Sequence, residues 1–209
     1  MSDFNSIVQS EEEIRELIGY PSELVKHKVI DHLDAHCKEF ISLSPLLFIS
    51  SSDDRGFCDV SPRGDMPGFV LVLDDRRIII PERPGNRRID TLRNIIKNPR
   101  VGLIFVIPGL EETLRVNGRA QIIKDPKLLN LMHVKGKNPL LGTVVTIEEC
   151  YVHCAKAFKR SQLWDQSTWL DNKRLPNIAR MLTLHASEMQ LSEDDVRKAL
   201  QDSYTYRLY

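Results

Sequence analysis

The sequence has 209 residues, with 29 basic and 29 acidic side chains, so its formal net charge is zero. This length suits one domain with a substantial core, with or without appended helices. A protein whose main task is to bind nucleic acid usually carries a basic excess, so that class is not expected. The sequence contains no run of about 18 apolar residues, so no membrane span is expected. The polar, acidic start lacks the pattern of a signal peptide, which predicts a cytoplasmic protein.

The first 43 residues predict an N-terminal helical region. Ser10 and Glu13 have the spacing of a capping box, so a short helix is expected to begin after Ser10. Apolar residues then recur at intervals of three and four, which predicts a second helix over about residues 22–41.

Short segments rich in β-branched and aromatic residues dominate the next part of the chain. We expect strands at about residues 46–50, 57–61, 68–73, 76–80, 101–107, 112–123 and 143–152, with helices at about 88–97 and from Pro126. The connections are too short for crossover helices, so the strands should pair antiparallel. Gly118, inside a long strand, predicts a β-bulge or a close backbone approach. The pattern favours a mainly antiparallel, α+β fold built around a small barrel.

The end of the chain predicts two further helices. One is expected after Pro176, and the other after Ser192, which three acidic residues follow. The sequence contains no internal repeat and no low-complexity linker. We therefore expect a single domain over residues 1–209, with the barrel at 44–165 and a helical C-terminal tail at 166–209.

The segment Pro84-Gly85-Asn86-Arg87-Arg88 lies between an expected buried strand and an expected helix start. Unpaired N–H groups, the helix dipole and two guanidinium groups together suit a phosphate dianion. Arginine at this end of a helix opposes the dipole, so its local structural benefit is hard to identify. The alternative interpretation is a solvated basic turn.

Two other segments combine groups that could contact a ligand. Ser61-Pro62-Arg63 follows a strand, although Arg63 could simply pair with Asp65 at the surface. Lys156, Arg160 and Trp164 are four residues apart, which gives a helix one basic and aromatic face suited to a planar ligand. The alternative for this face is a solvated amphipathic helix whose tryptophan packs on the barrel.

Cys150, His153 and Cys154 cluster near the last expected strand. Their spacing is not that of a zinc knuckle, and no second Cys/His pair follows. Ordinary packing is therefore expected here, and no metal site is predicted.

Taken in order, these segments resemble the pyridoxamine-5′-phosphate-oxidase-like, FMN-binding split barrels. The matching segments are residues 61–65, 78–81, 85–88, 98–101, 112–120 and 150–164. The resemblance covers roughly residues 46–164 and implies a split β-barrel of the FMN-binding type with N- and C-terminal helical extensions. The tail has Arg207 but not the Arg-x-His substrate motif of the oxidase proper, so we expect a subgroup outside that enzyme.

The resemblance also implies a homodimer that binds FMN at the subunit interface. By resemblance, Arg87 and Arg88 hold the phosphate beside Asn86, and Thr113 reaches the cofactor from the neighbouring subunit. The other implied cofactor-binding residues are Ser61, Pro62 and Arg63 along the ribityl chain and ring, Ile79, Ile80 and Pro81 through their backbone, and Lys156, Arg160, Ser161 and Trp164 beside the ring. No catalytic acid or base is assigned.

The function implied is that of an FMN-dependent oxidoreductase acting on a small organic substrate, with neither a nucleic-acid nor a membrane partner. Two alternatives stay open. One is a non-enzymatic flavin-binding or redox-sensing module, and the other is the same fold binding haem or a deazaflavin.

Overall fold

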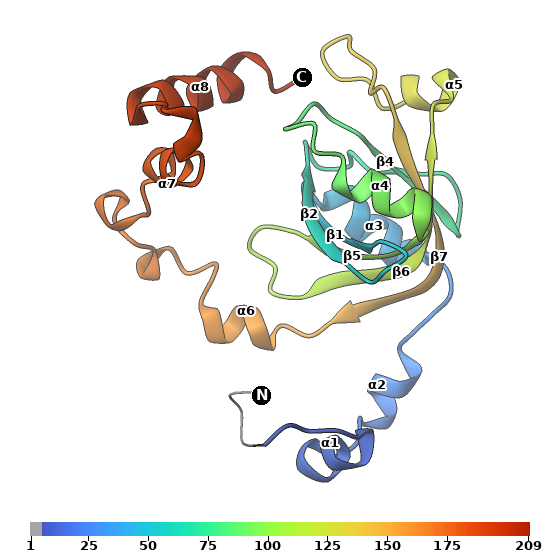
Figure 1. Ribbon diagram of the computed structural model, residues 1–209. Coiled ribbons are helices and arrows are strands. Elements are labelled where there is room, and N and C mark those ends of the chain that lie inside the picture. The colour runs from blue at the N-terminus through green and yellow to red at the C-terminus, as the bar shows by residue number, and fades with distance from the viewer. Residues whose placement is uncertain (1–5) are drawn as a thin grey trace.

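The computed structural model describes residues 6–209. Within this range it contains seven strands, eight α-helices and three 3-10 helices (Figure 1). The strands are β1 (Leu46–Ser52), β2 (Cys58–Gly64), β3 (Leu71–Val72), β4 (Arg77–Pro81), β5 (Arg100–Val106), β6 (Thr113–Ile123) and β7 (Gly142–His153). The α-helices are α1 (Glu11–Ile18), α2 (Glu23–His27), α3 (Ala35–Leu43), α4 (Asp90–Lys97), α5 (Pro126–Asn130), α6 (Lys156–Ser161), α7 (Ile178–His185) and α8 (Glu193–Tyr206).

All seven strands form one antiparallel sheet in the order β2-β1-β5-β6-β7-β4-β3. The sheet curls into a barrel that remains open between β2 at one edge and the β4–β3 pair at the other (Figure 1). Its interior is filled by inward-facing side chains such as Leu47, Ile49, Leu103, Phe105 and Val116, each at most 1% exposed. These alternate with outward residues, as a sheet with one buried face requires.

The expected irregularity at Gly118 is confirmed. The register between β6 and β7 shifts between Asn117 and Gly118. A Cβ atom at Gly118 would lie 2.1 Å from the backbone oxygen of Thr146. Only glycine permits this close approach, so the bulge shapes the longest strand pair of the barrel.

The N-terminal region differs from the sequence-based expectation in one respect. Ser10 caps α1 as expected, accepting a hydrogen bond from the Glu13 N–H at 3.2 Å. The prediction of a single helix over residues 22–41 is wrong, because a non-helical segment separates α2 from α3. There Ile30 exchanges two backbone hydrogen bonds with Cys150 of β7, at 3.0 and 2.7 Å. Asp34 then caps α3, and pairing with a distant strand overrides the apolar periodicity.

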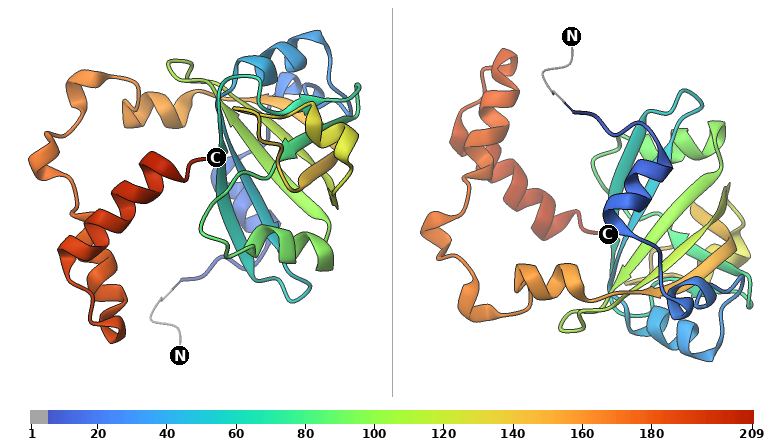
Figure 2. Two further views of the ribbon diagram at one scale, coloured as in Figure 1. Left: turned by 90° about the horizontal axis from the view of Figure 1, so that it is seen from above. Right: turned by 90° about the horizontal axis from the view of Figure 1, so that it is seen from below.

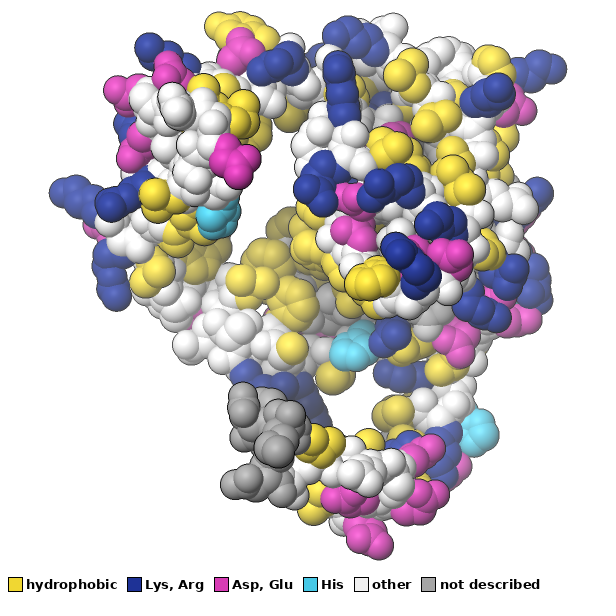
Figure 3. All heavy atoms as spheres, viewed as in Figure 1, with side chains coloured by type: hydrophobic (Ala, Val, Ile, Leu, Met, Phe, Trp, Pro, Cys, Tyr) yellow, Lys and Arg dark blue, Asp and Glu magenta, His cyan; other side chains and the backbone are white. Residues whose placement is uncertain are grey.

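Residues 156–209, here called the C-terminal arm, leave the barrel after β7, contact its β5–β6 connection through Lys159 and Trp164, and return to the barrel at their end (Figures 1 and 2). The two helices expected in the tail are present as α7 and α8. The side chain of Asn177 caps α7, and Ser192 forms a capping box with Asp195 at α8. Hydrophobic side chains line the hollow between the arm and the barrel (Figure 3). No helix in residues 6–209 combines the length and apolar character of a membrane span.

Candidate functional site

The open edge of the barrel brings β2 next to the chain that follows β4. Three side-chain pairs cross this seam. Arg63 Nη2 lies 3.5 Å from Glu82 Oε2, Arg83 Nε donates to Asp65 Oδ2 at 2.7 Å, and Thr91 Oγ1 donates to Asp59 Oδ2 at 3.0 Å. Because β2 is one edge of the sheet and β4 is next to the other edge, the curling of the sheet brings the two sides of this seam together.

The segment between β4 and α4 lies along the seam and has an unusual backbone. Arg87 and Ile89 have φ values of 61° and 55°, in the left-handed region. This conformation is rare for side chains other than glycine, and a β-branched residue such as Ile89 is a genuine outlier there. Ile89 is also the N-cap of α4 and provides no side-chain hydrogen bond. The N–H groups in the first turn of α4 therefore have no capping side chain.

The two arginines of this segment have different surroundings. Arg88 Nε donates to Asp90 Oδ2 at 2.8 Å, and this contact raises the pKa of Arg88. Asn86 Oδ1 accepts from the Arg88 N–H at 3.1 Å, which fixes the turn. Arg87 is exposed and has no ion-pair partner among residues 6–209. A free guanidinium thus lies beside a helix start with unpaired donors.

Arg63 and Glu82 form the interior of the seam. Arg63 also donates to Ser61 Oγ at 2.6 Å, so the β2 residues and the chain after β4 share one polar contact network. Burial raises the pKa of Glu82, and the positive charge of Arg63 offsets part of that effect. Burial thus favours the protonated form of Glu82.

The other predicted site residues lie in two different environments. The side chains of Ile79, Ile80 and Pro81 are buried in β4, so only their backbone could meet a ligand. Pro62 is exposed on β2. None of these side chains contributes a polar group to the seam.

Thr113 and α6 form a second group at the far end of the barrel. Thr113 is 4% exposed and pairs with His153, the last residue of β7. Lys156, Arg160 and Ser161 are exposed on α6. Trp164 follows α6, donates from Nε1 to the Leu110 oxygen at 2.9 Å, and stacks on Phe158 with ring centroids 5.8 Å apart.

Within one chain, the end of β4 and Thr113 lie at opposite ends of β7. Pro81 pairs with Gly142 at the start of this strand, whereas Thr113 pairs with His153 at its end. At the usual rise per residue, the strand spans roughly 35 Å. Among residues 6–209, no hydrogen bond or ion pair joins Arg87 or Arg88 to Thr113 or to α6.

The cysteine cluster proves to be two unrelated environments. Cys150 is buried, with its Sγ 3.5 Å from that of Cys37, whereas Cys154 is exposed beyond β7. Among residues 6–209, no three His, Cys, Asp or Glu side chains are grouped so that they could hold a metal ion.

Residues 33–154 match the family model described as pyridoxamine 5′-phosphate oxidase, which covers more than half of the chain. The chain belongs to this family. The expected family and the expected α+β split-barrel fold are thereby confirmed. None of the curated proteins matches the chain.

Several solved structures are similar to this member of the family. HupZ from Group A Streptococcus is 18% identical over 57% of this chain and 93% of its own, with a TM-score of 0.47. A putative pyridoxamine 5′-phosphate oxidase from Lactobacillus delbrueckii is 20% identical over 58% and 95%, with a TM-score of 0.47. A protein related to general stress protein 26 from Clostridium acetobutylicum is 15% identical over 56% and 85%, with a TM-score of 0.43.

Sequence reasoning missed several contributors to the seam, among them Glu82, Arg83 and Tyr209. Glu82 and Arg83 directly follow the predicted residue Pro81, so their position in the chain could have indicated them. Tyr209 donates from Oη to Asp65 Oδ1 at 2.7 Å, across 144 residues of sequence. No local pattern marks a contact of that kind.

Proposed function

We propose that this chain is an FMN-binding flavoprotein, an oxidoreductase that acts on a small organic substrate as a homodimer with the cofactor at the subunit interface. The observation that carries the proposal is the segment around Arg87, where two arginines adjoin the uncapped start of α4. Helix N-termini with free N–H groups are common phosphate sites, and arginine binds phosphate with two parallel hydrogen bonds.

The backbone of this segment supports the same interpretation. Holding a residue such as Arg87 or Ile89 in the left-handed region costs about 1–2 kcal/mol each. Strain of this kind persists where the surrounding structure imposes it, and it clusters at ligand-binding sites. A solvated basic turn has no comparable reason to keep two such residues.

The seam would then accommodate the rest of the cofactor. FMN supplies hydride or electron transfer when bound, while the protein orients it and adjusts its charge. Ser61 and Arg63 would line this region, with Arg63 offsetting negative charge on the ring. Glu82, whose pKa is raised by burial, is the group we assign to hold a proton beside it.

A second copy of the chain would complete the site. Within one chain, Thr113, Lys156, Arg160 and Trp164 make no hydrogen bond or ion pair with Arg87 among the described residues, so we assign them to the cofactor of the neighbouring subunit. The arm also leaves large apolar side chains uncovered, including Trp169, Leu170, Leu175, Ile178 and Met181. Exposed apolar surface of this extent is typical of a protein interface.

Replacement of both Arg87 and Arg88 by alanine tests the phosphate assignment. Each charge-assisted hydrogen bond contributes about 1.5–3 kcal/mol, so the double variant should bind FMN at least about a hundredfold more weakly. Arg93→Ala is the matched control, since Arg93 is an exposed arginine one turn further along α4 that pairs with Asp90. Fluorescence titration of the flavin measures both affinities.

Unchanged FMN affinity in the double variant would refute the assignment. The absorption spectrum of the purified protein tests the cofactor itself, because a Soret band would indicate haem instead of a flavin. Turnover of a nicotinamide with a quinone or dye would separate an oxidoreductase from a flavin-binding module.

A further inference from the structure

Tyr209 is held by groups from three separate segments beside the seam. Its hydroxyl donates to Asp65 Oδ1 at 2.7 Å, and its ring centroid lies 4.9 Å from Lys135 Nζ and 6.0 Å from the guanidinium carbon of Arg83. Lys137 Nζ donates to the main-chain oxygen of Tyr209 at 2.8 Å. The hydroxyl, the ring and the oxygen are thus each matched by a different partner.

Asp65 is built to receive a hydroxyl group. Its side chain is 1% exposed and accepts from Arg83 Nε, from the Met66 N–H and from Tyr209 Oη. A buried carboxylate is costly unless donors surround it. Removal of Tyr209 takes one donor from Oδ1, and an incoming hydroxyl group would restore it.

Lys135 reaches the ring from a strained turn. Val134 and Lys137 form a two-residue hairpin bridge, and the residues between them, Lys135 and Gly136, have φ values of 50° and 72°. Turns of this type favour Asn or Asp before the glycine. Lysine in the left-handed region costs about 1–2 kcal/mol. A cation at the face of an aromatic ring contributes a favourable interaction that asparagine would lack.

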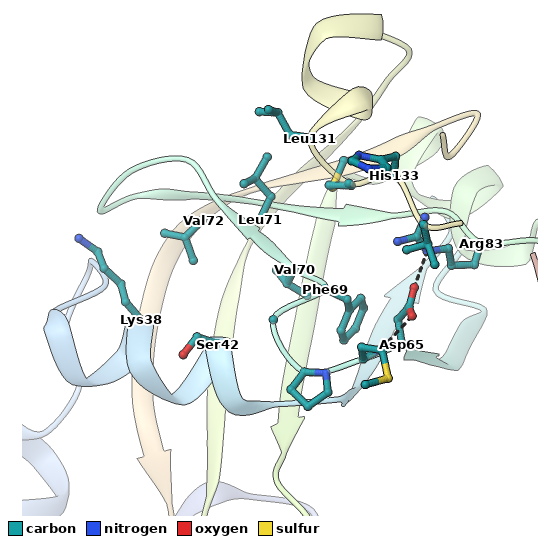
Figure 4. A pocket seen from close by; sticks show the side chains of 15 residues that line it. Lys38, Ser42, Asp65, Phe69, Val70, Leu71, Val72, Arg83, Leu131 and His133 are labelled. Carbon is teal, nitrogen blue, oxygen red and sulfur yellow. Dashed lines mark hydrogen bonds and ion pairs between the residues drawn. The ribbon is translucent and has the colours of Figure 1, made fainter. Parts of the chain in front are cut away.

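Asp65 and Arg83, which both contact Tyr209, also line a cavity of about 460 Å³ (Figure 4). Its other walls include the apolar residues Phe69, Leu71 and Met132, and the polar lining comprises Lys38, Ser42 and His133 besides the buried ion pair. Small-molecule sites commonly combine apolar walls with a few convergent polar groups. The ion pair that holds Tyr209 is therefore shared with a space large enough for a small ligand.

We propose that Asp65, Arg83, Lys135 and Lys137 form a binding site for phenols that carry a carboxylate, and that Tyr209 is its built-in occupant. The phenolic hydroxyl of a ligand would donate to Asp65, its ring would lie beside Arg83 and Lys135, and its carboxylate would meet Lys137. A free ligand must displace Tyr209, so binding releases the end of the C-terminal arm. This site does not depend on the flavin assigned above.

Calorimetric titration of the full-length protein with 4-hydroxyphenylacetate and with phenylacetate tests the proposal. Tyr209→Ala should bind 4-hydroxyphenylacetate at least about tenfold more tightly than the unaltered protein, because the competing side chain is gone. Phenylacetate should bind that variant about tenfold more weakly, because it lacks the hydrogen bond to a charged partner. Lys135→Asn keeps the turn and, added to Tyr209→Ala, should weaken binding several-fold.

Tyr206→Ala is the matched control, since Tyr206 is 78% exposed in the same arm. It should bind like the unaltered protein. Equal affinity for the two compounds, absence of binding to Tyr209→Ala, or equal binding with and without Tyr209 would each overturn the proposal. The affinity for 4-hydroxyphenylacetate should be the same with and without added FMN. A failure of the flavin assignment would therefore leave the result of this test unchanged.

Discussion

Two carboxyl groups at the seam show how neighbours decide ionisation at the scale of single residues. Burial raises the pKa of Asp65, but hydrogen bonds from Tyr209 and Met66 and the charge of Arg83 outweigh it, so the pKa is lowered. Burial also raises the pKa of Glu82, and only the charge of Arg63 opposes it, so the pKa stays raised. The number of donors, and not burial alone, separates the two groups.

The free energy of unfolding should therefore depend on pH through both carboxyl groups. The contribution of Asp65 should fall as the pH is lowered, and that of Glu82 should fall as the pH is raised. Asp65 stabilises the fold above its ordinary pKa of 3.8, and that contribution is lost as the pH falls through its lowered value. Folded Glu82 keeps its proton above the ordinary value of 4.5, so its contribution declines as the pH rises from there through its raised pKa. Asp65→Asn should flatten the acid-side loss, and Glu82→Gln should flatten the decline above 4.5.

Urea unfolding at several pH values between about 3 and 7 measures both slopes as free energies of unfolding. The two variants serve as controls for each other, because each should change one limb of the profile and leave the other. Parallel profiles for the unaltered protein and both variants would contradict the assigned shifts.

At the scale of elements, β6 and β7 form the framework on which both ends of the site depend. β7 carries the pairing with β4 at one end and leads into α6 at the other. Gly118 sets the bulge between the two long strands, so it governs how the sheet curves.

Gly118→Ala should destabilise the fold by at least about 2 kcal/mol, because the new methyl group meets the Thr146 backbone, which cannot move without breaking the sheet. Gly85→Ala is the control, since a Cβ there has no neighbour within 4 Å. Its effect should be neutral or slightly stabilising. Urea unfolding compares the two variants, and equal free energies of unfolding would show that the bulge tolerates a side chain.

At the scale of the whole molecule, the proposed dimer would bring the two groups of predicted site residues together across subunits. The arm supports this arrangement, because it stands away from the barrel with apolar side chains facing the hollow between them (Figure 3). In a monomer, the apolar side chains that line this hollow would be exposed to water. A second subunit would cover them.

Mixing two defective variants tests this arrangement. Arg87→Ala/Arg88→Ala and Lys156→Ala/Arg160→Ala should each bind FMN weakly alone. After unfolding and refolding together, about a quarter of the sites should regain tight binding, because half the dimers are mixed and each holds one intact site. Bound flavin, measured after gel filtration, reports the recovery. No recovery would mean that both groups belong to one chain or that only one of them binds FMN.

The sequence alone was sufficient for most of the strands, the caps at Ser10 and Ser192 and the bulge at Gly118, although the strand expected at residues 68–73 is reduced to Leu71–Val72. Each depends on local periodicity, local turn chemistry or side chains within a few residues of one another. The same local pattern misled at residues 22–41, where an apolar stripe suited a helix equally well.

Tertiary structure decided which of these segments meet. The pairing of Ile30 with Cys150, the approach of Arg63 to Glu82 and the contact of Tyr209 with Asp65 all join parts of the chain that are distant in sequence. They follow from how the sheet curls and where its open edges meet. That closure is set by packing and hydrogen bonding over the whole barrel, which no short stretch of residues encodes.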